Sequence, residues 1–131
     1  MSGALFRQVY DAAGRREWDT VSSLCSPDLV ITEPPSLPFG GEYRGRDALL
    51  KLFTTVMDYW DNPQVTIDAV VGDDVHAAVI LTFTMTSKHT GRTFTQTLVE
   101  SARSQNGLVT EMRIHYFDTA EVAREAGPKR G

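Results

Sequence analysis

The chain has 131 residues, 41% hydrophobic and 23% charged, which is typical of one globular domain with a sizeable core. A formal net charge of −4, a pI near 5.3 and the absence of any Lys/Arg run argue against a nucleic-acid partner. Apolar stretches such as 77–81 are too short to cross a bilayer, and the N-terminus lacks a basic-then-apolar signal, so we expect a cytoplasmic protein without a membrane partner.

Cysteine and histidine are sparse. Cys25 is the single cysteine, so no internal disulfide can form, and no Cys or His stands near it at metal-ligand spacing. His76 and His89 fall next to predicted turns, away from His115, so we expect no metal site. Residues 39–41 lack the helix N-terminus and the Lys of a phosphate-binding loop, and we expect no cofactor.

The first quarter of the chain predicts two amphipathic helices. Apolar residues three and four apart indicate a helix over residues 3–13, which Gly14 ends. A shorter helix is expected over about residues 16–26, closed by Pro27. The inward side chains of the two helices are Leu5, Phe6, Val9, Tyr10, Ala13, Trp18, Val21, Leu24 and Cys25.

An apolar strand from Leu29 to Ile31 leads to Glu33, which directly precedes Pro34 and Pro35. A residue before proline is restricted to extended geometry, and two prolines remove two backbone donors, so Glu33 is held where the strand stops. Residues 34–41 predict a loop inside one domain, because the apolar pattern resumes after them. A carboxylate fixed beside apolar groups is suited to act as a base.

A third and longest helix is predicted over residues 45–60, ended by residues 61–63. The apolar period then changes to two, and turns at 72–74, 89–91 and 105–107 predict an antiparallel meander. We expect its strands over about residues 65–71, 77–86, 92–103 and 108–118. Residues 119–131 predict a polar C-terminal tail with one or two helical turns from residue 121.

Helices followed by a meander predict an α+β fold: a cone-shaped barrel in which three helices from the N-terminal half pack over a strongly curved antiparallel sheet. We expect a single domain over residues 1–131. The curvature leaves a cavity beneath the helices, where small ligands bind. Regular alternation in the last strand would place Met112, Ile114, Tyr116 and Asp118 on one face and Arg113, His115 and Phe117 on the other, and a bulge would reassign these faces.

Four stretches together resemble a SnoaL-like domain of the nuclear-transport-factor-like superfamily, whose relatives include ketosteroid isomerase, limonene epoxide hydrolase and scytalone dehydratase. The stretches are residues 18–19, 26–34, 41–49 and 107–118. The resemblance covers about residues 4–127. It implies the cone-shaped fold but leaves the chemistry open, because this fold carries isomerases, cyclases, dehydratases, epoxide hydrolases and binding modules.

The resemblance also implies roles for individual residues. Glu33 falls where ketosteroid isomerases place the Asp that moves a proton. Gln96 falls near their protonated oxyanion-binding Asp, a departure that argues against steroid isomerisation. Residues 116–118 resemble the aromatic pair and acid that end the last strand of SnoaL-like cyclases, so Asp118 is a candidate proton donor or acceptor. Arg113 with Asp118 only partly matches the Asp-Arg-Asp set of limonene-type epoxide hydrolases.

Each candidate also has a purely structural interpretation. Glu33 is either a base whose pKa is raised in an apolar cavity or a solvated carboxylate at a loop entrance. His115 either relays protons or is simply packed or solvent-facing, and Asp118 either serves the pocket or caps the following segment. Tyr43 either donates to a substrate oxygen or belongs to the core. An inward Gln96 requires a bound ligand or a polar network.

The expected wall of the cavity is apolar and aromatic, and it supplies shape rather than chemistry. Glu100 lies on the same strand face as Gln96 but is expected nearer the open end. The predicted substrate-contacting residues are Tyr10, Trp18, Phe53, Met57, Trp60, Phe83, Met85 and Leu98.

Two functions are consistent with these features. The first is a cofactor-independent acid/base enzyme of polyketide cyclase or isomerase type, acting on a hydrophobic natural-product-like molecule; epoxide opening is a variant. In it Glu33 moves a proton, while Tyr43, Gln96 and either His115 or Asp118 hold the oxyanion and return the proton. The second is a non-catalytic module that binds a small ligand. In both we expect a homodimer formed through the threonine-rich outer face of the sheet, Thr82, Thr84, Thr86, Thr93, Thr95 and Thr97.

Overall fold

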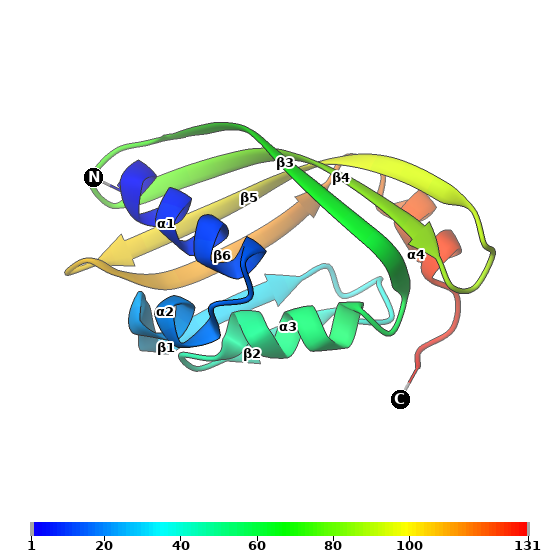
Figure 1. Ribbon diagram of the computed structural model, residues 1–131, viewed down its shortest axis with the longest axis horizontal. Helices are drawn as coiled ribbons and strands as arrows, with labels where there is room; N and C mark the ends of the chain where they lie inside the picture. Colours follow the sequence, from blue (N-terminus) through cyan, green and yellow to red (C-terminus); the bar gives the residue numbers. More distant parts are fainter. Residues whose placement is uncertain (1, 131) are drawn as a thin grey trace.

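The computed structural model describes residues 2–130 and has the predicted α+β architecture (Figure 1). Its helices are α1 (Ser2–Gly14), α2 (Trp18–Ser23), α3 (Ala48–Val56) and α4 (Thr119–Ala126). Its strands are β1 (Cys25–Glu33), β2 (Gly41–Arg44), β3 (Trp60–Gly72), β4 (His76–Ser87), β5 (Thr93–Gln105) and β6 (Leu108–Tyr116). No helix among the described residues is long and apolar enough to cross a membrane.

One six-stranded, strongly curved sheet organises the domain, with the strand order β2-β1-β6-β5-β4-β3. Strands β3 to β6 form the predicted antiparallel meander, and β2 pairs with β1 as a hairpin. The pairing of β1 with β6 is parallel and joins Ile31 to Met112 and Thr32 to Arg113. This pairing places the end of β1 beside the end of β6, although the two strands are far apart in the sequence.

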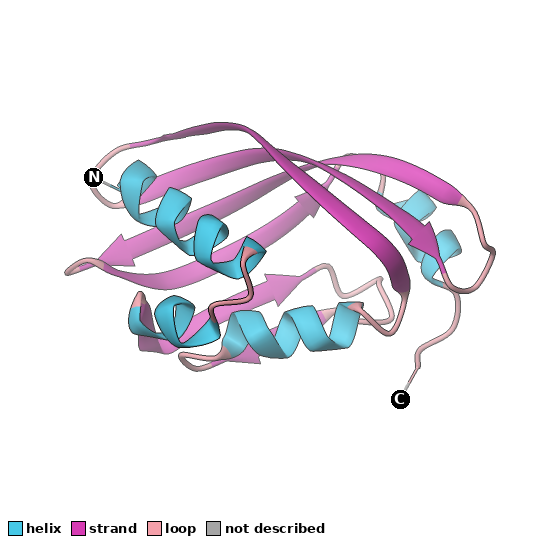
Figure 2. Ribbon diagram, in the orientation of Figure 1, coloured by secondary structure: helices cyan, strands magenta, loops and turns pink. Residues whose placement is uncertain are grey.

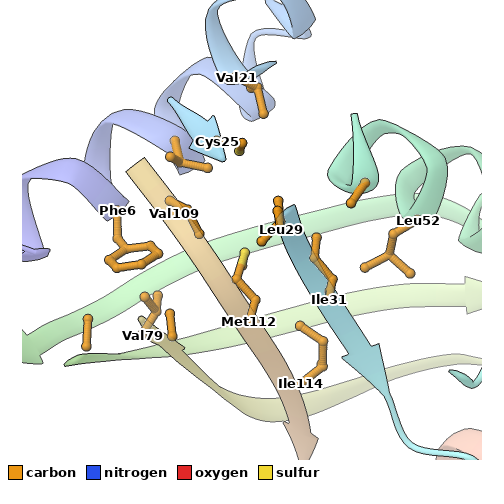
Figure 3. Close-up of a cluster of buried hydrophobic side chains, with 14 of the residues drawn as sticks. Phe6, Val21, Cys25, Leu29, Ile31, Leu52, Val79, Val109, Met112 and Ile114 are labelled. Atoms are coloured by element: carbon orange, nitrogen blue, oxygen red, sulfur yellow. The ribbon is translucent and has the colours of Figure 1, made fainter. Parts of the chain in front are cut away.

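The first three helices cover the concave face of the sheet, and α4 lies at the other end of the long strands (Figure 2). The main core fills the space between α1, α2, α3 and the sheet, and Figure 3 shows its side chains converging from these elements. Its fully buried members include Phe6, Val9, Val21, Leu29, Ile31, Val79, Val109 and Met112.

A second core cluster closes the opposite end of the sheet. It packs α4 against the Pro34–Gly41 loop and the starts of β3 and β5, through Leu37, Phe39, Tyr59, Trp60, Met85, Phe94, Val122 and Ala126. The prediction of a polar C-terminal tail is therefore wrong for residues 119–126. Asp118 caps α4, and Val122 and Ala126 form an apolar stripe too short to stand out in the sequence.

Three boundaries differ from the sequence prediction. Pro27 lies inside β1, at the register shift before Val30, where the ladder needs no backbone donor. The third helix is shorter than predicted, because Trp60 already begins β3 and the left-handed Asn62 forms an irregularity in that strand. The short strand β2 was not predicted, since four residues give too little alternation to identify.

Candidate active site

A cavity of about 820 Å³ lies between the helices and the concave face of the sheet. α1 and α3 form its roof, and β1, β3, β4, β5 and β6 form its floor and sides. The wall is mainly apolar, and its aromatic members are Tyr10, Trp18, Phe53, Trp60, Phe83 and Tyr116. A volume of this size accommodates a small organic molecule.

Glu33 projects into this cavity from the last position of β1 and is only 3% exposed. The Tyr116 hydroxyl donates to both of its carboxyl oxygens, at 2.9 Å from Oε1 and 3.2 Å from Oε2. Burial raises the pKa of Glu33 to about 8; the Tyr116 hydrogen bond opposes this rise, and the charge of Glu100 adds to it. Glu33 therefore exchanges its proton near neutral pH.

The loop after Glu33 fixes the end of β1. Glu33 pairs with Gly41 across the β1–β2 ladder, and the Pro34 carbonyl accepts a hydrogen bond from the Leu37 amide at 3.1 Å. The chain then folds so closely on itself that a Cβ atom on Gly40 would lie 2.1 Å from the Pro34 carbonyl oxygen. Only glycine permits this approach, and the resulting tight loop directly follows the strand end that carries Glu33.

A second carboxyl group, Glu100 on β5, lines the same cavity. The Tyr10 hydroxyl of α1 donates to its Oε1 atom. Burial raises the pKa of Glu100 to about 7, against the effect of the Tyr10 hydrogen bond, which lowers it. Glu100 is half-buried in this wall. The alternation along β5 already indicated its inward direction, but the curvature that brings it under α1 is not visible in the sequence.

Tyr43 does not line the cavity. Its hydroxyl donates to the Phe39 carbonyl oxygen at 2.6 Å, so it supports the loop behind Glu33 instead of facing a ligand. Burial, followed by the charge of Glu33, raises the pKa of Tyr43. We therefore correct the prediction that Tyr43 contacts the reacting oxygen: it is a support for the position of Glu33.

Gln96 and Asp118 belong to a polar network that attaches α4 to the sheet. The Gln96 amide nitrogen donates to Glu121 at 2.7 Å, and its oxygen accepts from the Asp118 backbone amide at 2.9 Å. The Asp118 carboxylate caps the helix by accepting from the Glu121 amide at 3.2 Å. Gln96 is buried as expected, but the network satisfies it, so neither residue reaches the cavity.

His115 lies on the outer face of the sheet. It is exposed, and its Nε2 atom is 3.1 Å from the Ser101 hydroxyl. Its neighbours Ile114 and Tyr116 point into the cavity, so the regular alternation of β6 directs His115 away from it. Arg113 is exposed on the same outer side, and the partial match to an Asp-Arg-Asp set does not form a site.

The predicted wall residues lie where expected with one exception. Tyr10, Trp18, Phe53, Met57, Trp60, Phe83 and Leu98 line the cavity. Met85 is 1% exposed in the second core cluster and does not line it, because β4 has by then passed beyond the cavity. Within residues 2–130, no group of three or more His, Cys, Asp or Glu side chains has an arrangement that could hold a metal ion.

Comparisons with known proteins agree on the fold. An NTF2-like protein of unknown function from Burkholderia pseudomallei is 25% identical, with a TM-score of 0.82 over 94% of this chain and 95% of that chain. A ketosteroid-isomerase-like protein from Catenulispora acidiphila, in complex with trimethylamine, is 14% identical, with a TM-score of 0.75 over 95% and 92%. TerC, co-crystallised with polyporic acid, is 19% identical, with a TM-score of 0.81 over 94% and 95%.

A search of curated proteins finds no match. The sequence profile of the SnoaL-like domain, in contrast, matches residues 6–112, which include the three N-terminal helices, Glu33 and most of the meander. Together with the curved sheet and the cavity beneath its helices, this match shows that the chain belongs to the SnoaL-like domain family.

Proposed function

We propose that this SnoaL-like domain is a cofactor-independent enzyme that moves protons on a hydrophobic, natural-product-like molecule, as a polyketide cyclase or isomerase does. The observation that carries the proposal is the position of Glu33, a buried carboxyl group that faces a large apolar cavity and is held by a tyrosine. A proton-transfer residue works best when its pKa lies near the working pH, and Glu33 meets this condition.

In the proposed reaction, the Glu33 carboxylate removes a proton from a carbon next to a substrate carbonyl. The Tyr116 hydroxyl keeps the carboxylate oriented and reduces the cost of its charge in the apolar cavity. The negative charge then develops on the substrate oxygen, which needs a donor nearby. The Tyr10 hydroxyl, which lines the cavity beside Glu100, is our candidate for that donor.

The two carboxyl groups of the cavity affect each other, and Glu100, with the lower pKa of about 7, ionises before Glu33, with a pKa of about 8. The charge of Glu100 raises the pKa of Glu33, so a proton is favoured on one group when the other is ionised. A pair that shares a proton in this way supplies one acid and one base in the same cavity. Epoxide opening could use the same pair, with the ionised carboxylate activating a hydroxyl group or water and the protonated carboxyl group donating to the epoxide oxygen.

Deuterium exchange tests this function without knowledge of the natural substrate. The protein is incubated in D2O with a panel of hydrophobic cyclic ketones and 1,3-diketones, and deuterium incorporation beside the carbonyl is followed by NMR. We expect Glu33→Gln to reduce the exchange rate by about 10²–10⁴-fold. The matched control is Glu111→Gln on β6, whose carboxylate is half-exposed and outside the cavity.

If folded Glu33→Gln keeps the full rate of deuterium exchange, Glu33 is not the base of the reaction. If the wild-type protein binds panel members but exchanges none of them and opens no epoxide, the alternative of a non-catalytic binding module replaces the enzyme.

We further propose that the domain forms a homodimer through the outer face of β4 and β5. Threonines from both strands lie side by side there, with Thr84 and Thr95 hydroxyls 2.9 Å apart and Thr86 and Thr93 hydroxyls 2.8 Å apart. The apolar Val99 continues this face and is 36% exposed. Light scattering should give a dimer mass for the wild-type protein and a monomer mass for Val99→Lys. Thr20→Lys, on the exposed side of α2, is the control.

A further inference from the structure

The cavity has an unbalanced set of charged groups. Its interior holds the carboxyl groups of Glu33 and Glu100, and the basic side chains among its described lining residues, Arg7 and Arg16, are both exposed at its rim. The Arg16 guanidinium donates to the Ala13 carbonyl oxygen at 2.8 Å and lies over the Phe53 ring, 4.3 Å from the ring centroid. Among the described residues, neither Glu33 nor Glu100 forms an ion pair with a basic side chain, and no nearby cation lowers the pKa of either group.

Each of the two carboxyl groups also keeps unused hydrogen-bonding capacity. In residues 2–130, the donor to Glu33 is Tyr116 and the donor to Glu100 is Tyr10. An ionised carboxylate can accept about four hydrogen bonds, so one phenol leaves most of this capacity free. Because Glu33 is buried and Glu100 lines the same cavity, this capacity is open to a ligand in the cavity.

The surrounding elements add no compensating charge. Tyr10 of α1 and Tyr116 of β6 are neutral phenols, and the pKa of each is raised well above its usual value, first by burial. Tyr43 of β2 lies behind Glu33, and Asp11 at the rim is paired with Arg15. The lining residues of α3, β3 and β4 are uncharged: Leu49, Leu52, Phe53, Val56, Met57, Trp60, Pro63, Val65, Ile67, Val70 and Phe83.

We propose that the cavity binds a hydrophobic amine as its ammonium ion, held between the carboxylates of Glu33 and Glu100 and the aromatic side chains of the wall. The ammonium charge would reduce the repulsion between two ionised carboxylates and compensate their loss of water. The faces of Trp60 and Phe83 attract cations, and a desolvated site strengthens that attraction. An anion would meet two acids, and a neutral ligand would leave their charges without a partner.

This inference names the ligand class of the cavity and rests on its proposed use as the substrate site, but binding of the amine does not require turnover. A fixed-charge probe, benzyltrimethylammonium, is compared with its neutral isostere neopentylbenzene. Trp18 and Trp60 line the cavity, so tryptophan fluorescence reports the binding of both probes, and calorimetry checks the affinities.

We expect the cation to bind at least about tenfold more tightly than the neutral isostere at pH 8.5. Its affinity should rise between pH 6 and pH 9 as the two carboxyl groups ionise, whereas the affinity of neopentylbenzene should not rise. Glu33→Gln and Glu100→Gln should each weaken binding of the cation and spare binding of the isostere. Glu111→Gln should change neither, and circular dichroism establishes that each variant is folded.

Equal affinity for the two probes, tighter binding of the neutral one, or no measurable binding of the cation would overturn the inference. These results are separable from the test of catalysis. If Glu33→Gln stops deuterium exchange but the wild-type protein shows no preference for the cation, the ligand class is wrong and the proposed function stands. If the preference is present but exchange does not depend on Glu33, the proposed function is wrong and the ligand class stands.

Discussion

The hydroxyl of Tyr116 donates to both carboxyl oxygens of Glu33, which lies 83 positions earlier in the chain. The parallel pairing of β1 with β6 makes this contact possible, because it brings the ends of the two strands together. The phenol stabilises the ionised form of an acid that its apolar surroundings would otherwise keep protonated. This relationship controls when Glu33 can act as a base.

Replacing Tyr116 by Phe should move the pH dependence of the proposed reaction upward. The hydrogen bond from Tyr116 lowers the pKa of Glu33, so its loss should raise that pKa above about 8. The rate of deuterium exchange measured from pH 6 to pH 10 should then have its rising limb at higher pH in Tyr116→Phe than in the wild-type protein. An unchanged midpoint in the folded variant would show that Tyr116 does not tune Glu33.

The raised pKa of Glu33 should also make the domain less stable at high pH. The folded state holds this proton up to about pH 8, whereas the unfolded chain releases it near pH 4.5, so stability falls as pH rises between these values. Glu33→Gln should remove part of this fall and be more stable than the wild type at pH 8.5, by roughly 2–4 kcal/mol. Urea unfolding at pH 5 and pH 8.5 measures the difference, with Glu111→Gln as the control.

Gln96→Leu should destabilise the domain by about 1–3 kcal/mol, because it removes both hydrogen bonds that join β5 to the start of α4. Thermal unfolding measures this loss, and Gln105→Leu at the exposed end of β5 is the matched control. The initial rate of the proposed reaction at a temperature where both proteins are folded should remain unchanged. A loss of activity without a loss of stability would instead show that Gln96 acts in the catalytic site.

Gly40→Ala should make the protein easier to unfold and should shift the position of Glu33. The new methyl group would lie 2.1 Å from the Pro34 carbonyl oxygen and 2.9 Å from that of Leu37, so the loop would have to move. We expect a loss of about 2–3 kcal/mol in unfolding free energy. Gly14→Ala is the control, because its Cβ atom meets nothing within 4 Å. Equal stability of the two variants would contradict the tight loop.

The sequence predicts the fold and Glu33 well because both depend on local signals. Alternating apolar residues identify the meander, and the Pro34–Pro35 pair identifies the strand end that carries Glu33. Period-two alternation also distinguishes the faces of β6, which already separated Tyr116 from His115. The error lay in the choice of which face of β6 lines the cavity, because the sequence does not reveal which side of the sheet the helices cover.

The remaining errors concern contacts between distant parts of the chain. Gln96 looked like a ligand-binding residue because its partner Glu121 lies in a segment predicted to be a tail, and its partner Asp118 lies at the end of the predicted last strand. The pairing of Glu100 with Tyr10 depends on how α1 crosses the curved sheet, and no local pattern encodes that crossing. Glu33 at the strand end and Tyr10 in the cavity wall could thus be predicted from sequence, whereas the pairing of Glu33 with Tyr116 and of Glu100 with Tyr10 could not.

The position of β6 at the centre of the sheet has a consequence for synthesis of the protein on the ribosome. β1 is translated early, but its parallel neighbour β6 is translated after the other five strands. Residues 25–33 can therefore form their pairing with β6 only once residues 109–113 have been synthesised. The β1–β2 hairpin therefore stays without a neighbouring strand until β6 has been translated. We expect the domain to reach its native state only after residues 109–113 have emerged from the ribosome, and the nascent chain to depend on protection from aggregation until then.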